Sequence, residues 1–181
     1  MIVLVGKTCS GKSTVADLLE SRYDIKRVRT YTTRPRREGE GENEYHFVTD
    51  EEFEELRANN FFFETTHYEV ASGAVWKYGT GKTEFCRDCC VVMNPDGVKK
   101  VKKLFPIEYE IKIIYLNVTE GAQWNRLRSR GQDADEAARR VEADKRDFYD
   151  IDNYYDIAIN TDNLDSEQTA DMIYCFVMNY Q

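Results

Sequence analysis

The segment GKTCSGKS, residues 6–13, constrains the fold of this chain more than any other stretch of its sequence. It fits the pattern G-x-x-x-x-G-K-[ST], which needs a buried strand before it and a helix after it. Residues 2–5 form a short β-branched run typical of a buried strand, and residues 13–23 carry apolar side chains at helical spacing. The order of strand, glycine-rich turn and helix predicts the opening βα unit of an α/β fold.

Such a turn is suited to phosphate groups, because its backbone amides and the positive end of the helix converge there. Small residues at Gly6 and Gly11 leave room for the phosphates to approach. Lys12 is expected to reach the β- and γ-phosphates of a triphosphate, and the Ser13 hydroxyl to bind Mg²⁺. The pattern alone does not separate ATPases, GTPases and kinases, which share it.

Three further segments, residues 89–93, 111–118 and 155–160, have the composition of buried strands, with helical stretches between and after them. This alternation predicts a mostly parallel sheet covered by helices. Residues 30–85 differ in composition, being rich in aromatic, glycine and charged residues. This change in composition predicts an inserted subdomain.

Charged segments predict further helices. Residues 49–60 begin with Thr49 or Asp50 as a candidate N-cap and carry acidic residues in the first turn. Residues 123–149 are dense in arginine, aspartate and alanine, and predict two charged helices joined at Gly131.

Charge and hydropathy exclude several classes of partner. The formal net charge is −8 and the pI is near 4.9, so a broad basic surface for nucleic acid or anionic lipid is not expected. No stretch approaches the roughly 20 apolar residues of a membrane span, and the N-terminal run lacks a basic region and a cleavage site. We therefore expect a cytoplasmic protein, without membrane or nucleic-acid partners, whose binding of phosphate is local.

The chain has five cysteines, three of them crowded at Cys86, Cys89 and Cys90, and fits a disulfide framework poorly. Reduced thiols are the expected state. A zinc site would need about four ligands, and the remaining candidates stand at unrelated spacings. These candidates are Cys9, His46, His67 and Cys175.

The acidic chain gathers three arginines, Arg34, Arg36 and Arg37, in one short bend. A dianionic phosphate needs several charge-assisted donors, and guanidinium groups supply them as bidentate forks. The bend belongs to a set of four segments in a characteristic order, GKTCSGKS (6–13), TTRPRREGE (32–40), EYHFV (44–48) and YGT (78–80). On these segments the chain resembles guanylate kinase along most of its length.

The resemblance implies a P-loop nucleoside monophosphate kinase fold, with a parallel β-sheet core flanked by helices. A mixed α+β nucleotide-binding subdomain is inserted into this core, and a helical lid follows it. The implied boundaries are a core of residues 1–29, 86–122 and 152–181, an insertion of residues 30–85 and a lid of residues 123–151.

The resemblance also implies roles in an acceptor site. In the family, two arginines and two tyrosines hold the phosphate of GMP, and they match Arg34, Arg37, Tyr45 and Tyr78. The chemistry agrees, because tyrosine hydroxyls add neutral donors to the charged forks of arginine.

The base of GMP would be recognised by Glu64 and Thr80, with Thr30 in place of a family serine and Asn94 at a further acceptor position. Guanine presents two N–H donors beside the O6 acceptor, so a carboxylate and a hydroxyl match it. Adenine would leave the carboxylate facing an acceptor, and a buried unpaired polar group is a strong source of selectivity. An ordinary surface position is the alternative for Glu64.

The donor site implied by the resemblance combines the loop with the lid. Its ATP-binding residues are Gly6, Thr8, Ser10, Gly11, Lys12, Ser13, Thr14 and Asn160. Arg130 and Arg140 would act with Lys12 in catalysis, because phosphoryl transfer needs positive charge at the equatorial oxygens. Charge pairs on a solvated helix are expected for most of Arg126, Arg128, Arg139, Lys145 and Arg146.

The chain departs from the family pattern in several places. Val92 and Asn94 stand where the family has an acid-containing segment after its fourth strand, and Asp96 follows two residues later. Asn94 can hydrogen-bond a base or a metal-bound water, but it brings no negative charge. Arg36 replaces a usual proline, and the stretch before Tyr78 is longer.

The resemblance therefore implies an ATP-dependent kinase that converts GMP or dGMP to the diphosphate, with Mg²⁺ as cofactor and small-molecule nucleotides as partners. Two alternatives stay open. One is a related kinase with another acceptor, such as a different nucleoside monophosphate or a phosphorylated ribose compound. The other is a guanylate-kinase-like protein-binding module without catalysis, although the intact Lys12 and Ser13 favour an enzyme. The oligomeric state is left open.

Overall fold

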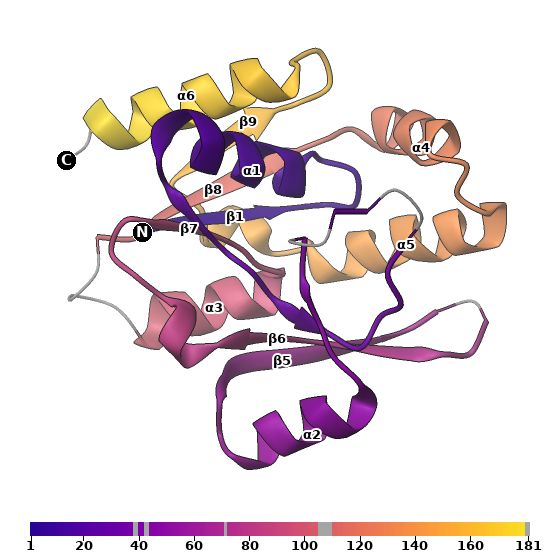
Figure 1. Cartoon of the computed structure of the whole chain (residues 1–181). Coiled ribbons are helices and arrows are strands. Elements are labelled where there is room, and N and C mark those ends of the chain that lie inside the picture. Colours follow the sequence, from indigo (N-terminus) through magenta and orange to yellow (C-terminus); the bar gives the residue numbers. More distant parts are fainter. Residues whose placement is uncertain (38–39, 42–43, 71, 105–109, 180–181) are drawn as a thin grey trace. The chain divides into compact units, whose positions relative to one another are not determined.

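The computed structural model describes residues 1–37, 40–41, 44–70, 72–104 and 110–179 (Figure 1). The chain divides into two compact units. One is formed by Met1–Arg27 together with Arg87–Gln181, and the other by Val28–Cys86.

The first unit is built on a five-stranded sheet in the order β2-β7-β1-β8-β9. Its strands are β1 (Ile2–Gly6), β2 (Lys26–Val28), β7 (Cys89–Val92), β8 (Lys112–Asn117) and β9 (Ile157–Asn160). β1 pairs in parallel with β7 and β8, and β8 pairs in parallel with β9. The predicted parallel sheet is confirmed, and the carboxyl ends of these strands therefore meet at one edge.

Helices cover both faces of this sheet (Figure 1). α1 (Lys12–Tyr23) and α6 (Ser166–Asn179) pack together on one face, and α3 (Pro95–Leu104) lies on the other. Burial of apolar surface, worth roughly 25 cal/mol per Å², stabilises this arrangement. The buried cluster beneath α1 and α6 contains Ile2, Leu4, Val15, Ala16, Leu19, Cys90, Ile114, Leu116, Ile159, Ala170 and Ile173.

Two charged helices follow β8, as predicted, namely α4 (Glu120–Ser129) and α5 (Ala134–Asp147). The turn between them contains Gly131 at a φ of 64°, a left-handed conformation that favours glycine. The side chains of Thr119 and Asp133 cap the two helices. The helices share a small apolar cluster of Leu127, Ala137 and Val141, and a short 3₁₀ turn, η2 (Ile151–Asn153), follows.

The second unit holds a four-stranded sheet in the order β4-β3-β6-β5. Its strands are β3 (Tyr31–Thr32), β4 (His46–Phe47), β5 (Phe62–Glu69) and β6 (Val75–Gly81), and a 3₁₀ turn, η1 (Lys82–Glu84), follows them. β6 runs antiparallel to β3 and β5, whereas β3 and β4 are parallel. The sheet is therefore mixed.

The helix of the second unit is α2 (Asp50–Ala58), which confirms the predicted helix in this region. Thr49, rather than Asp50, is the N-cap. Its hydroxyl accepts from the Glu52 amide at 3.1 Å, and the Glu52 carboxylate accepts from the Thr49 amide at 2.7 Å. This reciprocal capping box satisfies two backbone donors at the helix start.

The second sheet has two chemically different faces. A Cβ at Gly79 would meet the Phe62 ring at 2.7 Å, so only glycine fits beside that ring. Phe62 in turn stacks on buried Phe53 of α2, with centroids 4.6 Å apart. Because side chains alternate along a strand, the face opposite Phe62 carries Tyr78 and Thr80.

All five cysteines are free thiols. Cys89 and Cys90 are fully buried in β7, and burial raises the pKa of the Cys90 thiol. Across the described ranges, no group of three or more His, Cys, Asp or Glu side chains could hold a metal ion. No helix in this described part of the chain has both the length and the apolar character needed to span a membrane.

Candidate active site

The phosphate-loop candidate joins the carboxyl end of β1 to the start of α1. Gly6 is required by packing, since a Cβ there would meet both the Leu116 carbonyl oxygen and the Ser10 hydroxyl at 2.5 Å. Gly11 is required by conformation, since its φ is 94°. The fold therefore requires glycine at both positions, independently of the predicted binding of phosphate.

Lys12 is half-buried, and its side chain turns back over the loop. Nζ donates to the carbonyl oxygens of Gly6 at 2.5 Å and Lys7 at 2.8 Å. Burial lowers the pKa of Lys12 to about 8, the charge of Asp144 partly opposes this, and Arg130 adds to the lowering. A negative group beside Nζ would favour its charged form, so this position suits an anionic ligand.

The other predicted donor-site residues lie at the carboxyl edge of the first sheet, where open α/β sheets bind ligands. Asn160 is the last residue of β9, and its side-chain oxygen accepts from the Asp162 amide at 2.8 Å. The hydroxyl-bearing residues lie in the loop or at the start of α1, and they are Thr8, Ser10, Ser13 and Thr14.

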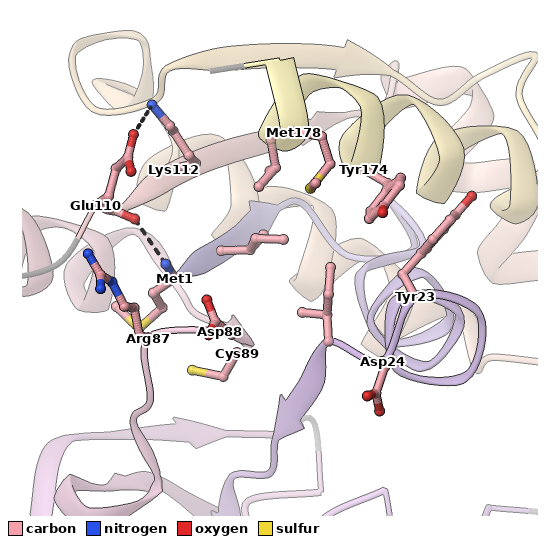
Figure 2. Close-up of a pocket in the computed structure, with 13 residues that line it drawn as sticks. Met1, Tyr23, Asp24, Arg87, Asp88, Cys89, Glu110, Lys112, Tyr174 and Met178 are labelled. Carbon is pink, nitrogen blue, oxygen red and sulfur yellow. Dashed lines mark hydrogen bonds and ion pairs between the residues drawn. The ribbon is translucent and has the colours of Figure 1, made fainter. Parts of the chain in front are cut away.

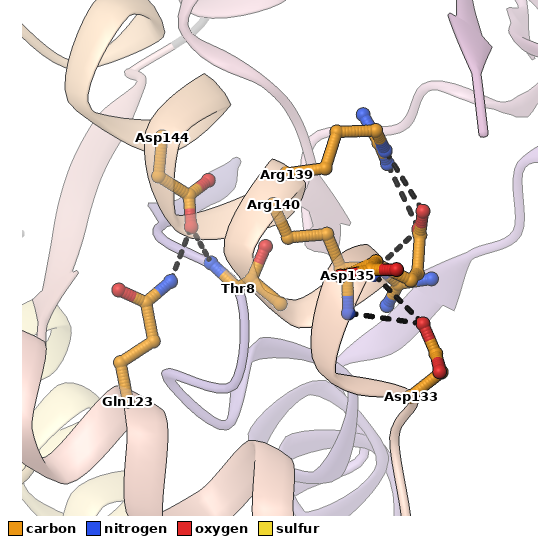
Figure 3. Close-up of polar contacts among 8 residues, drawn as sticks. Thr8, Gln123, Asp133, Asp135, Arg139, Arg140 and Asp144 are labelled. Atoms are coloured by element: carbon orange, nitrogen blue, oxygen red, sulfur yellow. Dashed lines mark hydrogen bonds and ion pairs between the residues drawn. The ribbon is translucent and has the colours of Figure 1, made fainter. Parts of the chain in front are cut away.

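α5 reaches the loop through Asp144, a contact that the sequence analysis missed (Figure 3). The Thr8 amide donates to Asp144 Oδ2 at 2.8 Å, and the Gln123 side chain donates to the same oxygen. Gln123 and Asp144 are both buried. The signal in the sequence was the position of Asp144 four residues after Arg140, on the same face of a helix.

Arg126 contradicts the expectation of a solvated charge pair. Its guanidinium donates to the Cys9 carbonyl oxygen at 3.0 Å, to the Thr161 hydroxyl at 3.2 Å and to the Thr161 carbonyl oxygen. α4 is thereby tied to the loop and to the segment that follows β9. The expectation failed because helical periodicity shows which residues share a face, but not what that face packs against.

The two predicted lid arginines have different surroundings. Arg130 is exposed after the last turn of α4, and it lowers the pKa of Lys12, so its charge lies within electrostatic reach of the loop. Arg140 Nε donates to Glu136 at 2.7 Å, and Arg139 pairs with the same carboxylate. Glu136 therefore holds Arg140 on the face of α5 that also carries Asp144 (Figure 3).

Glu40 organises the arginine bend of the second unit. Arg34 is 3% exposed, and its guanidinium forms two hydrogen bonds with the Glu40 carboxylate, at 2.5 and 2.9 Å. The Arg37 amide donates to this carboxylate at 3.0 Å, and Arg36 Nε donates to the Glu40 carbonyl oxygen at 2.8 Å. Burial by itself would raise the pKa of Glu40 and lower the pKa of Arg34. The hydrogen bonds between the two charged groups outweigh burial, so the pKa of Glu40 is lowered and the pKa of Arg34 is raised.

Aromatic rings complete this cluster. The Arg34 guanidinium lies 5.2 Å from the centre of the Tyr45 ring, a cation–π distance, and Tyr45 meets Tyr78 edge to face at 6.2 Å. Burial raises the pKa of Tyr78, whereas the charges of Arg34 and Arg37 lower it. The structure thus brings Arg34, Arg37, Tyr45 and Tyr78 together.

Glu64 and Thr80 lie side by side as cross-strand partners of β5 and β6. The Thr80 hydroxyl donates to Glu64 Oε1 at 2.8 Å, and Thr80 is fully buried. Glu64 is half-buried, which distinguishes it from an ordinary surface acid. Thr30 precedes β3, and its carbonyl oxygen accepts from the His46 amide at 3.0 Å.

Asn94 belongs to the first unit and has a role in the fold. Its side-chain oxygen accepts from the Gly97 amide at 2.8 Å, and its carbonyl oxygen accepts from the Val98 amide at 3.1 Å. Asn94 therefore caps the N-terminus of α3. Its predicted contact with an acceptor nucleotide stays a prediction.

A cavity of about 490 Å³ opens at the opposite edge of the first sheet, beside the starts of β1, β7 and β8 (Figure 2). Its wall includes Met1, Cys89 and Lys112, together with the rings of Tyr23 and Tyr174, which stack at 4.0 Å. The predicted site residues do not line it. The candidate active site is therefore the loop at the carboxyl edge, not this cavity.

Comparisons with known proteins agree with this geometry. The family profile described as guanylate kinase matches residues 1–173. A guanylate kinase of Nostoc sp. is 32% identical over 94% of this chain and 86% of its own length, and one of Thiobacillus denitrificans is 33% identical over 87% and 74%. The crystal structure of guanylate kinase from Anaplasma phagocytophilum is 26% identical, with a TM-score of 0.70 over 100% of this chain and 85% of that one. The chain belongs to the guanylate kinase family.

Proposed function

We propose that this protein transfers the γ-phosphoryl group of ATP to GMP or dGMP, giving ADP and the corresponding guanine nucleoside diphosphate. The observation that carries the proposal is the hydrogen-bonded pair of Glu64 and Thr80 on the face of the second sheet that also carries Tyr78. A carboxylate beside a hydroxyl matches the donors and the acceptor of guanine. The arginines around Tyr78 match the phosphate of the same nucleotide.

The donor site would be the loop of residues 6–13. Backbone amides at the start of α1 would surround the β-phosphate, and Lys12 would bridge the β- and γ-phosphates. Lys12 Nζ now bonds two neutral carbonyl oxygens, and phosphate oxygens would replace them with stronger charge-assisted bonds. The hydroxyls of Thr8, Ser10, Ser13 and Thr14 would add donors, and Asn160 would lie near the adenine.

The acceptor phosphate would lie among Arg34, Arg37, Tyr45 and Tyr78. Because Arg34 is buried and paired with Glu40, its guanidinium is oriented before substrate arrives. Thr30 and Asn94 would add contacts to the acceptor nucleotide.

The reaction needs in-line alignment and positive charge, not a covalent enzyme intermediate. A phosphate oxygen of GMP would attack the γ-phosphorus, the bond to the β–γ bridging oxygen would break, and ADP would leave. Lys12, Arg130 and Arg140 would neutralise charge on the equatorial oxygens. We place the two arginines in a lid of residues 123–151, whose closure would keep water from the γ-phosphate.

The loop fits Mg²⁺, which this reaction implies. The Ser13 hydroxyl lies in the first turn of α1, and Mg²⁺ prefers oxygen ligands. The described residues offer no carboxylate cage, which suits an ion bound mainly by substrate phosphates and waters. When bound, the ion would neutralise charge on the β- and γ-phosphates.

The proposal is tested by measuring ADP release with ATP, Mg²⁺ and each common ribo- and deoxynucleoside monophosphate in turn. GMP or dGMP is expected to give a kcat/KM at least about 10²-fold above that of AMP, since the paired Glu64 and Thr80 reject a mismatched base. Faster turnover with another phosphate acceptor would favour the second candidate, a related kinase, which Asn94 motivates. Binding of ATP without any turnover would favour a protein-binding module.

Glu64→Gln is expected to lower the ratio of GMP to AMP kcat/KM by on the order of 10²-fold, with a smaller effect on kcat for GMP. The amide cannot accept from both guanine donors, and it can donate to the N1 acceptor of adenine. Parallel steady-state kinetics with the two nucleotides measure this ratio. Glu69→Gln, exposed at the end of the same strand, is the matched control. An unchanged ratio in Glu64→Gln would remove Glu64 from the base site.

A further inference from the structure

The phosphate loop contains one non-glycine residue in a left-handed backbone conformation, and two neighbouring helices form hydrogen bonds to the loop beside it. Cys9 has a φ of 62°, in the left-handed region that residues with a Cβ rarely adopt. Hydrogen bonds to the two helices hold the backbone at Thr8, one peptide group before Cys9, and at the Cys9 carbonyl oxygen. The Thr8 amide donates to Asp144 of α5, and the Cys9 carbonyl oxygen accepts from Arg126 of α4.

Asp144 is well suited to hold this turn. Asp144 is 9% exposed, and one carboxylate oxygen accepts from both the Thr8 amide and the Gln123 side chain (Figure 3). Gln123 is 2% exposed, so the loop, α4 and α5 are joined by one buried polar contact. A polar network of this kind fixes geometry when every member has a partner.

We infer that Asp144 is a positioning residue of the donor site, which holds the Thr8 amide and, with Arg126, fixes the left-handed turn at Cys9. The turn shapes the loop, so that the amides from Gly11 onward point toward the phosphates. Because Asp144 lies one helical turn after Arg140, the helix that carries a lid arginine also sets the loop. The inference rests on the proposed binding of ATP at this loop.

A different role for Asp144 would predict the opposite change in nucleotide affinity when its carboxylate is removed. If the Asp144 carboxylate were a stand-in for phosphate that ATP displaces, its removal would strengthen nucleotide binding. The burial of Asp144 and its second bond to Gln123 favour a permanent contact. If ATP displaced the carboxylate, the buried Gln123 amide would lose its acceptor as well. The two roles therefore predict opposite changes in affinity.

The test measures the Kd of a non-hydrolysable ATP analogue with Mg²⁺ in the absence of any acceptor. The measured Kd values therefore do not depend on whether GMP is the true acceptor nucleotide. Asp144→Ala is expected to raise the Kd of the analogue about tenfold, the effect of one lost hydrogen bond that orders a loop. Asp144→Asn keeps an oxygen acceptor and is expected to stay within about threefold of wild type. Glu142→Ala, exposed on the same helix, is the control with no expected change.

A second substitution separates positioning from general stability. Cys9→Gly removes the Cβ that makes the turn unfavourable, so Cys9→Gly combined with Asp144→Ala is expected to recover most of the lost affinity. In steady-state assays, Asp144→Ala is expected to raise the KM for ATP with kcat within about threefold. Tighter binding by Asp144→Ala, an unchanged Kd with only a lower thermal midpoint, or no recovery in the double variant would each overturn the inference.

Discussion

Lys12→Met is expected to lower kcat/KM for phosphoryl transfer by on the order of 10³-fold or more, because it removes the charge nearest to the transferred group. The thermal midpoint is expected to change by only a few degrees. Burial lowers the pKa of Lys12 to about 8, so at pH 7 its charged form costs the folded protein stability, and removing the charge offsets the hydrogen bonds that are lost. Steady-state kinetics and thermal unfolding on the same preparation check both parts.

The matched control for this substitution is Lys103→Met, which removes a lysine from the exposed last turn of α3. Its kinetics are expected to equal those of wild type. If Lys12→Met kept more than about a tenth of the wild-type kcat/KM, the assignment of residues 6–13 as the donor-phosphate loop would be wrong.

Arg34→Ala is expected to raise the KM for GMP about 100-fold, with the KM for ATP within about threefold of wild type. Truncating one partner of a buried, hydrogen-bonded charge pair costs about 2–5 kcal/mol. Here the substitution removes a proposed donor to the acceptor phosphate. It also leaves the Glu40 carboxylate, now held by two bonds from Arg34, without that partner. Initial rates with each substrate varied in turn measure the two KM values.

Arg34→Lys refines this result, since lysine keeps the charge but loses the planar fork. Its KM for GMP is expected to lie between those of wild type and Arg34→Ala. Arg57→Ala, at an exposed arginine of α2 that pairs with Glu54 of the same helix, serves as the control. Equal increases in the KM values for GMP and ATP would show a general disturbance, not loss of the acceptor phosphate site.

Much of the first unit was predictable, because its strands are buried on both faces and alternate with amphipathic helices. The runs around Val3, Val91 and Ile114 contain almost no polar residue, which is the signature of parallel strands. The strands of the second unit were not predicted. β3 and β4 are two residues long, too short to show a pattern, and the sequence of β5, FFETTHYE, lacks the strict apolar–polar alternation that would predict a half-buried strand.

Candidate site residues were predictable where a motif carries them within a few positions, as in the loop with Lys12 and the bend with Arg34. Contacts between segments far apart in the sequence could not be predicted. Thr8 and Asp144 are 136 residues apart, and Arg126 lies 117 residues from Cys9. Such contacts depend on how the helices pack, and periodicity identifies a face without its partner. Glu40 lay inside a matched motif, but its pairing with Arg34 becomes visible only in the folded bend.

The central claim is tested most directly by incubating the protein with γ-labelled ATP, Mg²⁺ and GMP, and separating the labelled products. The account predicts that the label passes to the β-phosphate of GDP, with one ADP formed for each GDP and almost none of the label in inorganic phosphate. Label found mainly in inorganic phosphate, or retained in ATP while GMP stays unchanged, would contradict it.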